Sequence, residues 1–217
     1  CNLGLANLDL MTDCTQEEKN FIKGQLLFFR AWWHEELIAF YGGMPYVDTV
    51  LDGSQVLTLP RLSYQECAKK CAEDFRAAAD LLPNDWDKTT VGKKTLGKND
   101  IRITKVCALG YLGKVLLWAA SPLNNLGKAE IGASKNGDTY KYNTELAAQA
   151  ADALAEAIGE VNSGKTPYAL AEYKYSNIYD HEADKSSNSN FSDIFRTTGQ
   201  DWKMPGSTEA IMRGPHI

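Results

Sequence analysis

Residues 15–47 read TQEEKNFIKGQLLFFRAWWHEELIAFYGGMPYV, and this stretch contains the signals that decide the fold. Thr15 and Glu18 form a capping-box pattern, which is typical of a helix start. Apolar residues then recur at the helical period. They are Ile22, Leu26, Phe29, Trp33, Leu37 and Phe40. The glycines at 42–43 and Pro45 end the pattern. The stretch predicts a helix over about residues 17–40, and its further apolar residues, Phe21, Phe28 and Trp32, indicate that it is covered on more than one side.

Three more helices are predicted along the chain, over about residues 64–82, 104–120 and 144–161. The first has a second capping box at its start and Pro83 as its stop. The middle one has only Lys105 and Lys114 as charged residues, which is typical of a helix at the centre of a bundle. Its Gly110 and Gly113 indicate close helix packing. We therefore predict a mainly all-α fold of two antiparallel helical pairs that stack on each other.

The predicted helices occupy residues 1–167, whereas residues 168–217 form a loop-rich stretch of aromatic and polar residues. We expect both parts to belong to the same, larger domain. The connections over residues 42–62 and 121–142 are long. Long loops on a rigid scaffold often carry function, so we expect functional residues there.

Composition narrows the class of protein. The chain has 217 residues, a 44% hydrophobic share and a formal charge of −5. A charge of that sign argues against a nucleic-acid partner, which needs a basic face. The sequence has no apolar run long enough to span a membrane and shows no signal peptide. The five cysteines are an odd number, which is a poor disulfide framework, and we interpret them as small buried thiols.

Motifs for catalysis are missing from the sequence: it has no nucleophile elbow, P-loop, dinucleotide fingerprint or zinc-protease motif. His34, Glu35 and Glu36 lack a second histidine at the spacing that zinc needs, so we interpret them as a polar part of the first helix. The acidic residues of the loop-like tail leave a glycoside hydrolase open as an alternative. They are Asp180, Glu182, Asp184, Asp193 and Asp201. The oxygen-rich run over residues 184–193 lacks an EF-hand pattern, and we interpret it as a solvated loop. We expect no metal and no cofactor.

Aromatic residues outside the helical stripes are the candidates for ligand binding, because such rings can stack on the apolar face of a sugar. Trp86 and Trp202 both lie among polar residues, and Tyr179 lies in the aromatic tail. We predict these three as ligand-binding residues, and the alternative for Trp86 and Trp202 is that each plugs the base of its own loop. The tryptophans at 32, 33 and 118 lie on helical stripes, and we expect them in the core.

Four segments of the sequence together resemble the SusD/RagB family, the surface glycan-binding lipoproteins of nutrient-uptake systems in Bacteroidetes. GQLLFFRA at 24–31, followed by FYGGMPYV at 40–47, is similar to the family pattern GEAxFLRAxxYFxLVxxYGGxP. The second segment runs from PRLSYQE at 60–66 to LLP at 81–83. The third runs from RITK at 102–105 to AASP at 119–122, and the fourth from YN at 142–143 to YAL at 168–170. The resemblance covers nearly the whole chain.

The resemblance implies a tetratricopeptide-like scaffold that is not an enzyme. It implies a lipid-anchored protein of the outer membrane, exposed at the cell surface, that captures oligosaccharide or polysaccharide and acts with a SusC-like TonB-dependent transporter. Because family members are much longer, we expect the lipid-bearing cysteine to precede Cys1 and a C-terminal portion to follow Ile217. Residues 1–8 then resemble an internal helix. A helical-repeat scaffold that binds only proteins remains the other alternative.

Overall fold

The computed structural model describes residues 1–54, 58–125, 141–170 and 209–212. Five α-helices occur in these ranges: α1 (Asn2–Ala6), α2 (Gln16–Tyr41), α3 (Tyr64–Leu81), α4 (Lys105–Ala120) and α5 (Thr144–Asn162). Short 3₁₀-helices lie between them at Leu8–Leu10, Trp86–Lys88, Gly92–Thr95 and Pro122–Asn124. The described ranges contain no strand, which confirms the all-α prediction.

The helix boundaries agree with the sequence signals because the capping side chains form the expected hydrogen bonds. Thr15 accepts from the Glu18 backbone N–H, and the Glu18 carboxylate accepts from the Thr15 N–H at 2.9 Å. Ser63 and Glu66 repeat this arrangement at α3. Single side chains, Thr104 and Asn143, cap α4 and α5. Each cap satisfies backbone donors that would otherwise lack a partner in the first turn.

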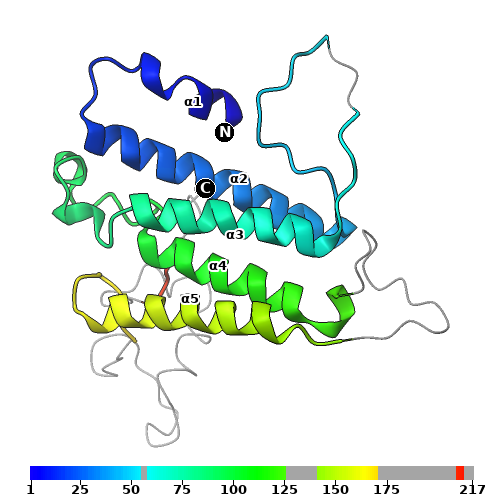
Figure 1. The fold of residues 1–217 in the computed structure, drawn as a ribbon. Helices are drawn as coiled ribbons and strands as arrows, with labels where there is room; N and C mark the ends of the chain where they lie inside the picture. The colour runs from blue at the N-terminus through cyan, green and yellow to red at the C-terminus, as the bar shows by residue number, and fades with distance from the viewer. Residues whose placement is uncertain (55–57, 126–140, 171–208, 213–217) are drawn as a thin grey trace, which may run out of the picture.

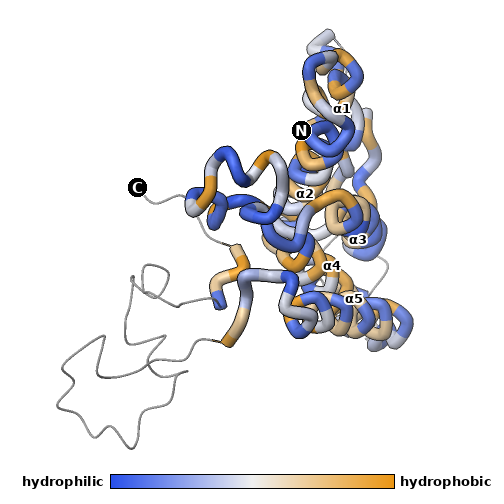
Figure 2. Tube along the Cα trace, turned by 90° about the vertical axis from the view of Figure 1, so that its left-hand side faces the viewer, coloured by the Kyte–Doolittle hydropathy of each residue, from blue (hydrophilic) through white to orange (hydrophobic). Residues whose placement is uncertain are grey.

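The four long helices stack in order, with α2 against α3, α3 against α4 and α4 against α5 (Figures 1 and 2). Gly24 lies against Leu82, and Arg30 pairs with Asp74, so α2 and α3 run antiparallel. Gly113 lies against Leu154 and Lys105 pairs with Glu160, so α4 and α5 do the same. Two antiparallel pairs therefore stack on each other, as predicted. Figure 1 shows that the loop after α3 and the chain after α5 lie at one end of this stack.

The two glycines of α4 have different environments. A Cβ atom on Gly113 would lie 2.5 Å from Cγ of Leu154, so this glycine allows α4 and α5 to approach closely. A Cβ atom on Gly110 would have no neighbour within 4 Å. The prediction of close packing is confirmed for Gly113 and wrong for Gly110.

The buried face of α2 is not the stripe that the sequence pattern favoured. The core contains the side chains that lie between the stripe positions: Phe21, Leu27, Phe28, Ala31 and Ile38. On the predicted stripe, Trp33 is 58% exposed and Phe40 is 80% exposed. Trp118 of α4 is also 47% exposed, so the expectation of a core position is wrong for Trp33 and Trp118. The helix has two apolar faces, and packing against α3 and α4 buries the other one.

A buried polar cluster joins α2 to α3 and to the loop that follows α2. The Arg30 guanidinium donates two hydrogen bonds to the Asp74 carboxylate, at 2.6 and 2.7 Å. The Tyr46 hydroxyl donates to the same carboxylate at 2.7 Å. Burial of this tyrosine raises its pKa. Arg30 also donates to the Asp48 carbonyl, which holds this loop along α2.

Glu35 belongs to the polar part of α2 that was expected over residues 34–36, but it is buried inside the stack. Its side chain is 2% exposed and pairs with the Lys114 ammonium of α4 at 3.0 Å. Burial raises the pKa of Glu35, and Lys114 opposes that shift. The carboxylate therefore links α2 to α4 inside the stack.

The cysteines divide into two groups. Cys67, Cys71 and Cys107 are buried free thiols, as interpreted from the sequence, and burial raises the pKa of each. Cys1 is exposed and Cys14 is half-buried, so that interpretation is wrong for Cys1. Within the described ranges, no helix is both long enough and apolar enough to cross a membrane.

Candidate functional site

The loop between α3 and α4 is built on two short 3₁₀-helices, Trp86–Lys88 and Gly92–Thr95. The Asp85 carboxylate caps the first by accepting from the Asp87 N–H at 3.0 Å. The Trp86 carbonyl accepts from the Thr89 hydroxyl at 2.8 Å, and the Gly92 N–H donates to that hydroxyl. A Cβ atom on Gly92 would lie 1.8 Å from the Trp86 carbonyl oxygen, so only glycine allows this close approach.

Trp86 anchors the loop to the helical stack. Its side chain is 2% exposed, and its indole N–H donates to the Ile103 carbonyl at 2.8 Å. The ring packs edge-on against Phe21 of α2, with centroids 5.0 Å apart. The Arg102 guanidinium lies over the ring, 4.9 Å from its centroid, and makes a cation–π contact. These contacts fix the position of the residues on either side of Trp86.

Asn99 ties the far end of the loop back to its start. Its amide group donates to the Asp87 carboxylate at 2.5 Å and to the Gly92 carbonyl at 2.9 Å. Its amide oxygen accepts from the Thr95 hydroxyl at 2.8 Å. Because Asn99 is buried and every one of these partners lies in the same loop, the loop has one defined shape.

The opposite wall comes from the chain that follows α5. The Tyr168 hydroxyl lies 2.9 Å from the Thr104 hydroxyl and 3.3 Å from the Ile211 carbonyl. Because Tyr168 donates its proton to that carbonyl, the Thr104 hydroxyl is the donor to Tyr168. The Thr104 oxygen accepts from the Cys107 N–H as the cap of α4, so one hydrogen-bonded chain links α4, Tyr168 and residue 211.

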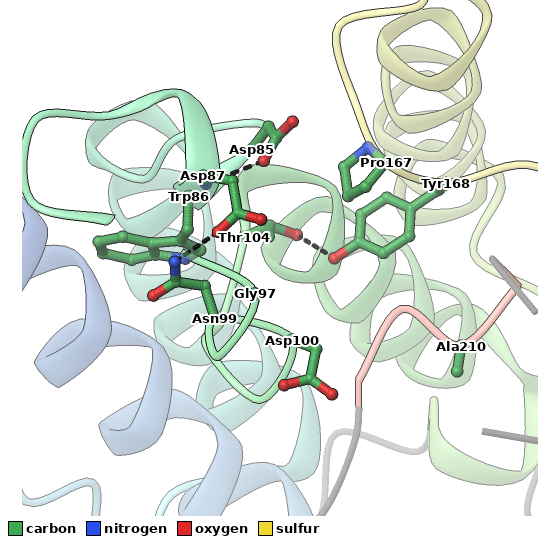
Figure 3. Close-up of a pocket in the computed structure, with 10 residues that line it drawn as sticks. All are labelled: Asp85, Trp86, Asp87, Gly97, Asn99, Asp100, Thr104, Pro167, Tyr168 and Ala210. Carbon is green, nitrogen blue, oxygen red and sulfur yellow. Dashed lines mark hydrogen bonds between the residues drawn. The ribbon is translucent and has the colours of Figure 1, made fainter. Parts of the chain in front are cut away.

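A cavity of about 270 Å³ lies between the two walls (Figure 3). Figure 3 shows Trp86, Asp87 and Asn99 on one side and Pro167 and Tyr168 on the other. The remaining lining residues are Asp85, Gly97, Asp100, Thr104 and Ala210. The cavity thus combines carboxylates, an amide and hydroxyls with aromatic and proline surface. Such a lining suits a small ligand with many hydroxyl groups.

The lining is acidic. Among the residues that the structure describes, the lining includes three carboxylates and no lysine, arginine or histidine. Lys88 lies 3.3 Å from the Asp85 carboxylate and offsets part of this charge. Arg102 of the same loop lies over the ring of Trp86, which is one of the lining residues. Lys94 pairs with Glu18 away from the cavity, and Lys105 at the start of α4 pairs with Glu160. The described residues contain no cluster of three or more histidine, cysteine or acidic side chains that could hold a metal ion.

Of the three residues predicted to bind ligand, the structure describes only Trp86. It lines the cavity, but its low exposure leaves a ligand access only to the part of the ring that faces the cavity. Trp202 and Tyr179 lie outside the described residues. Their roles, like that of Trp86, stay predictions.

Sequence reasoning missed Tyr168, Asn99 and Asp100 as lining residues. Tyr168 belongs to the YAL segment at 168–170 that resembles the family pattern, and nothing local signals its contact with Thr104. The run from Gly97 to Asp100 contains residues that are common in turns, and nothing in it signals that it lines a cavity.

Comparison with known proteins gives one match to a protein family. The SusD-like family described as "Starch-binding associating with outer membrane" matches residues 1–117, which is more than half of the chain. This range includes the whole loop from Asp85 to Thr104. No protein of curated function matches the sequence.

Several solved structures are similar to the chain. BT4246 is 22% identical over 80% of the chain, with a TM-score of 0.62. A SusD superfamily protein from Bacteroides fragilis is 22% identical over 72% of the chain, with a TM-score of 0.51. A SusD-like protein from the same species is 28% identical over 55%, with a TM-score of 0.47. The chain covers only 30%, 27% and 22% of these structures. The first two likenesses show that the fold is shared.

Proposed function

The chain belongs to the SusD-like family of starch-binding proteins that associate with the outer membrane, and on this premise we propose that it captures oligosaccharides at the cell surface for import. The single observation that carries the proposal is the family match over residues 1–117. That match contains the loop from Asp85 to Thr104, which forms most of the cavity. The same match also contains α1, α2, α3 and most of α4, which form the scaffold that carries this loop.

The chemistry of the cavity supports capture without catalysis. Its hydroxyl, amide and carboxylate groups are suited to hydrogen bonds with sugar hydroxyls, and the Tyr168 ring offers an apolar surface. Asp85, Asp87 and Asn99 are engaged in holding the loop together. In our proposal these groups position the ligand and do not transfer protons. Trp86 stiffens the wall, and Trp202 and Tyr179 supply further ring surface to the same glycan.

Import requires a partner, and we propose a SusC-like TonB-dependent transporter of the outer membrane. In this proposal a lipid anchor ahead of the helical scaffold holds the protein at the cell surface, next to the transporter. The helical stack then serves as the rigid part, and the loops at its end meet the glycan.

Two measurements on the intact protein test this function. Purification from outer membranes in mild detergent is expected to bring down a TonB-dependent transporter in a stoichiometric amount. Native affinity electrophoresis through gels that contain polysaccharides is expected to show retarded migration on at least one glycan. A protein that binds neither a glycan nor a transporter would contradict the proposal, and binding of proteins alone would favour a helical-repeat interaction scaffold.

A further inference from the structure

We propose that the contact between His34 and Val47 is a pH-sensitive switch, in which protonation of His34 releases residues 47–54 from the helical stack while the helices stay packed. The contact joins α2 to the loop that follows it. This loop leaves α2 at the end of the stack opposite to the cavity (Figure 1). The inference therefore does not rest on the proposed function. It combines the hydrogen bonds of the histidine ring, the packing that holds the ring and the charges around it.

Both nitrogens of the His34 ring make a hydrogen bond in the neutral state. The Val47 backbone N–H can only donate, so Nε2 accepts from it, at 3.0 Å. Nδ1 lies 2.7 Å from the Arg30 carbonyl, which can only accept, so Nδ1 carries the proton. A second proton on Nε2 would point at the Val47 N–H. Two donors would then face each other, and the hydrogen bond to the loop would be lost.

Packing keeps the ring in this orientation. His34 is half-buried and stacks on Tyr46, with ring centroids 3.9 Å apart and planes at 25°. The Tyr46 hydroxyl is itself fixed by its 2.7 Å hydrogen bond to Asp74. Stacking on an aromatic ring favours a cation, so the protonated ring stays on Tyr46 and Val47 moves away instead. Tyr46 is therefore the anchor after which the released segment begins.

Beyond this anchor, the segment is held through its backbone carbonyls. Asn2 of α1 donates to two of them, at 2.9 Å each, and Arg30 donates to a third at 3.0 Å. Residues 48–54 are exposed. Segments that bury little surface open locally at a small cost in free energy. Loss of the His34 hydrogen bond is therefore enough to change how often this segment opens.

Charged and titratable groups face His34 or its partner Tyr46 from three elements. They are Arg30 on α2, Tyr46 itself and Asp48 in the loop, and Lys70, Cys71 and Asp74 on α3. The two carboxylates favour the protonated ring, but each is already paired with a cation. Burial is the larger effect, and it lowers the pKa of His34 from its ordinary value of 6.5.

The direction of the switch follows from this lowered pKa. In the released state the histidine has its ordinary pKa, so release takes up a proton below pH 6.5 and the released fraction rises as the pH falls. One proton for each release limits the rise to about tenfold per pH unit. The rise ends below the pKa of the held state, because both states are then protonated. Above pH 6.5 the segment stays held.

Hydrogen–deuterium exchange of the intact protein at pH 7, 6 and 5, measured by mass spectrometry, tests the switch. Exchange rates are divided by the chemical exchange rates at each pH, so that the ratio reports protection alone. Fragments over residues 46–54 report on the segment, and fragments over α3 report on the stack. His34→Gln keeps an oxygen that accepts from the Val47 N–H but takes up no proton. His216→Gln removes a different histidine and is the matched control.

In the wild type and in His216→Gln, protection of residues 46–54 is expected to fall by more than about threefold from pH 7 to pH 5, whereas protection of α3 changes by less than about twofold. In His34→Gln, protection of the segment is expected to be the same at each pH. The comparison within the wild type decides even where a variant fails to fold.

Three results would overturn the switch. They are a wild-type segment whose protection does not depend on pH, an equal fall of protection in α3, and a fall that persists in His34→Gln or disappears in His216→Gln. None of them bears on glycan capture, which is tested by its own measurements.

Discussion

The Thr104 hydroxyl, which caps α4, lies 2.9 Å from the phenol oxygen of Tyr168, beyond the end of α5. Thr104 donates to Tyr168, and Tyr168 donates to the Ile211 carbonyl. This chain of hydrogen bonds directly links the two walls of the cavity. It makes the start of α4 a structural part of the candidate site.

Tyr168→Phe removes that link and keeps the ring. Loss of one half-buried hydroxyl that makes hydrogen bonds is expected to lower the free energy of unfolding by about 1 kcal/mol. Chemical denaturation measures the change. Tyr142→Phe is the matched control, since Tyr142 is an exposed tyrosine ahead of α5, and it is expected to change stability by less than about 0.5 kcal/mol. Equal losses in the two variants would show that the link contributes nothing.

Alanine substitution of the two α4 glycines is expected to act in opposite directions. Gly113→Ala places a methyl group against Leu154, where it would lie 2.5 Å from Cγ, and we expect a loss of about 1–3 kcal/mol. Gly110→Ala meets open space and gains helix propensity, so we expect a gain of about 0.5–1 kcal/mol. Thermal unfolding of the two variants, only one turn apart, measures the difference. A loss at both positions would contradict the packing of α4 against α5.

The Arg30–Asp74 pair is expected to contribute far more to stability than an exposed pair on the same helix. Asp74→Ala leaves a mostly buried guanidinium and the Tyr46 hydroxyl without their shared partner, and we expect a loss of about 3–5 kcal/mol. Asp80 pairs with Arg76 at the surface, and Asp80→Ala is expected to cost no more than about 0.5 kcal/mol. Urea denaturation compares them. Similar losses would mean that the buried cluster does not hold the loop after α2.

His34 is expected to make stability depend on pH below about 6.5. Burial lowers its pKa, and the neutral ring uses both nitrogens, with Nδ1 donating to the Arg30 carbonyl and Nε2 accepting from the Val47 N–H. Asp74, Arg30 and Asp48 are the charged groups around it. Below pH 6.5 the unfolded chain binds a proton that the folded chain does not. The stabilisation is therefore complete above pH 6.5 and is lost as the pH falls, by at most about 1.4 kcal/mol per pH unit.

The difference between the wild type and His34→Gln isolates this contribution. Glu35 has a raised pKa and changes stability in the opposite direction, and the capping glutamates have lowered pKa values and act at lower pH. These effects are common to both proteins and cancel in the difference. Unfolding free energies measured from pH 7 down to pH 5 are expected to converge as the pH falls. Unfolding free energies of the two proteins that stay parallel over this pH range would contradict a neutral His34 ring that makes both hydrogen bonds.

The helices and their pairing could be predicted from the sequence because their signals are local. The capping boxes at Thr15 and Ser63 and the stops at Gly42 and Pro83 place the ends within about two residues. The buried face of α2 could not be predicted, because Trp33 and Phe28 belong to two apolar stripes on one helix. Only packing against α3 and α4 decides which stripe enters the core.

The site was less accessible to prediction, because it depends on contacts between residues far apart in sequence. Trp86 stood out as a tryptophan off any helical stripe and it does line the cavity, while its burial agrees with the alternative that such a tryptophan plugs the base of its own loop. The contact between Thr104 and Tyr168, and the pairing of Glu35 with Lys114, have no local signature. Such pairs form only when distant parts of the chain are brought together, and the residue pattern of a single helix carries no information about that arrangement.

The central claim is that this protein holds a glycan and returns it unchanged. The most direct measurement is calorimetric titration of the intact protein with oligosaccharides of a glycan that retards it in native gels, followed by mass spectrometry of the recovered oligosaccharide. We predict saturable binding, recovery of the oligosaccharide at its original length and no new reducing ends. Release of shorter products, or the absence of saturable binding to every glycan tried, would contradict the account.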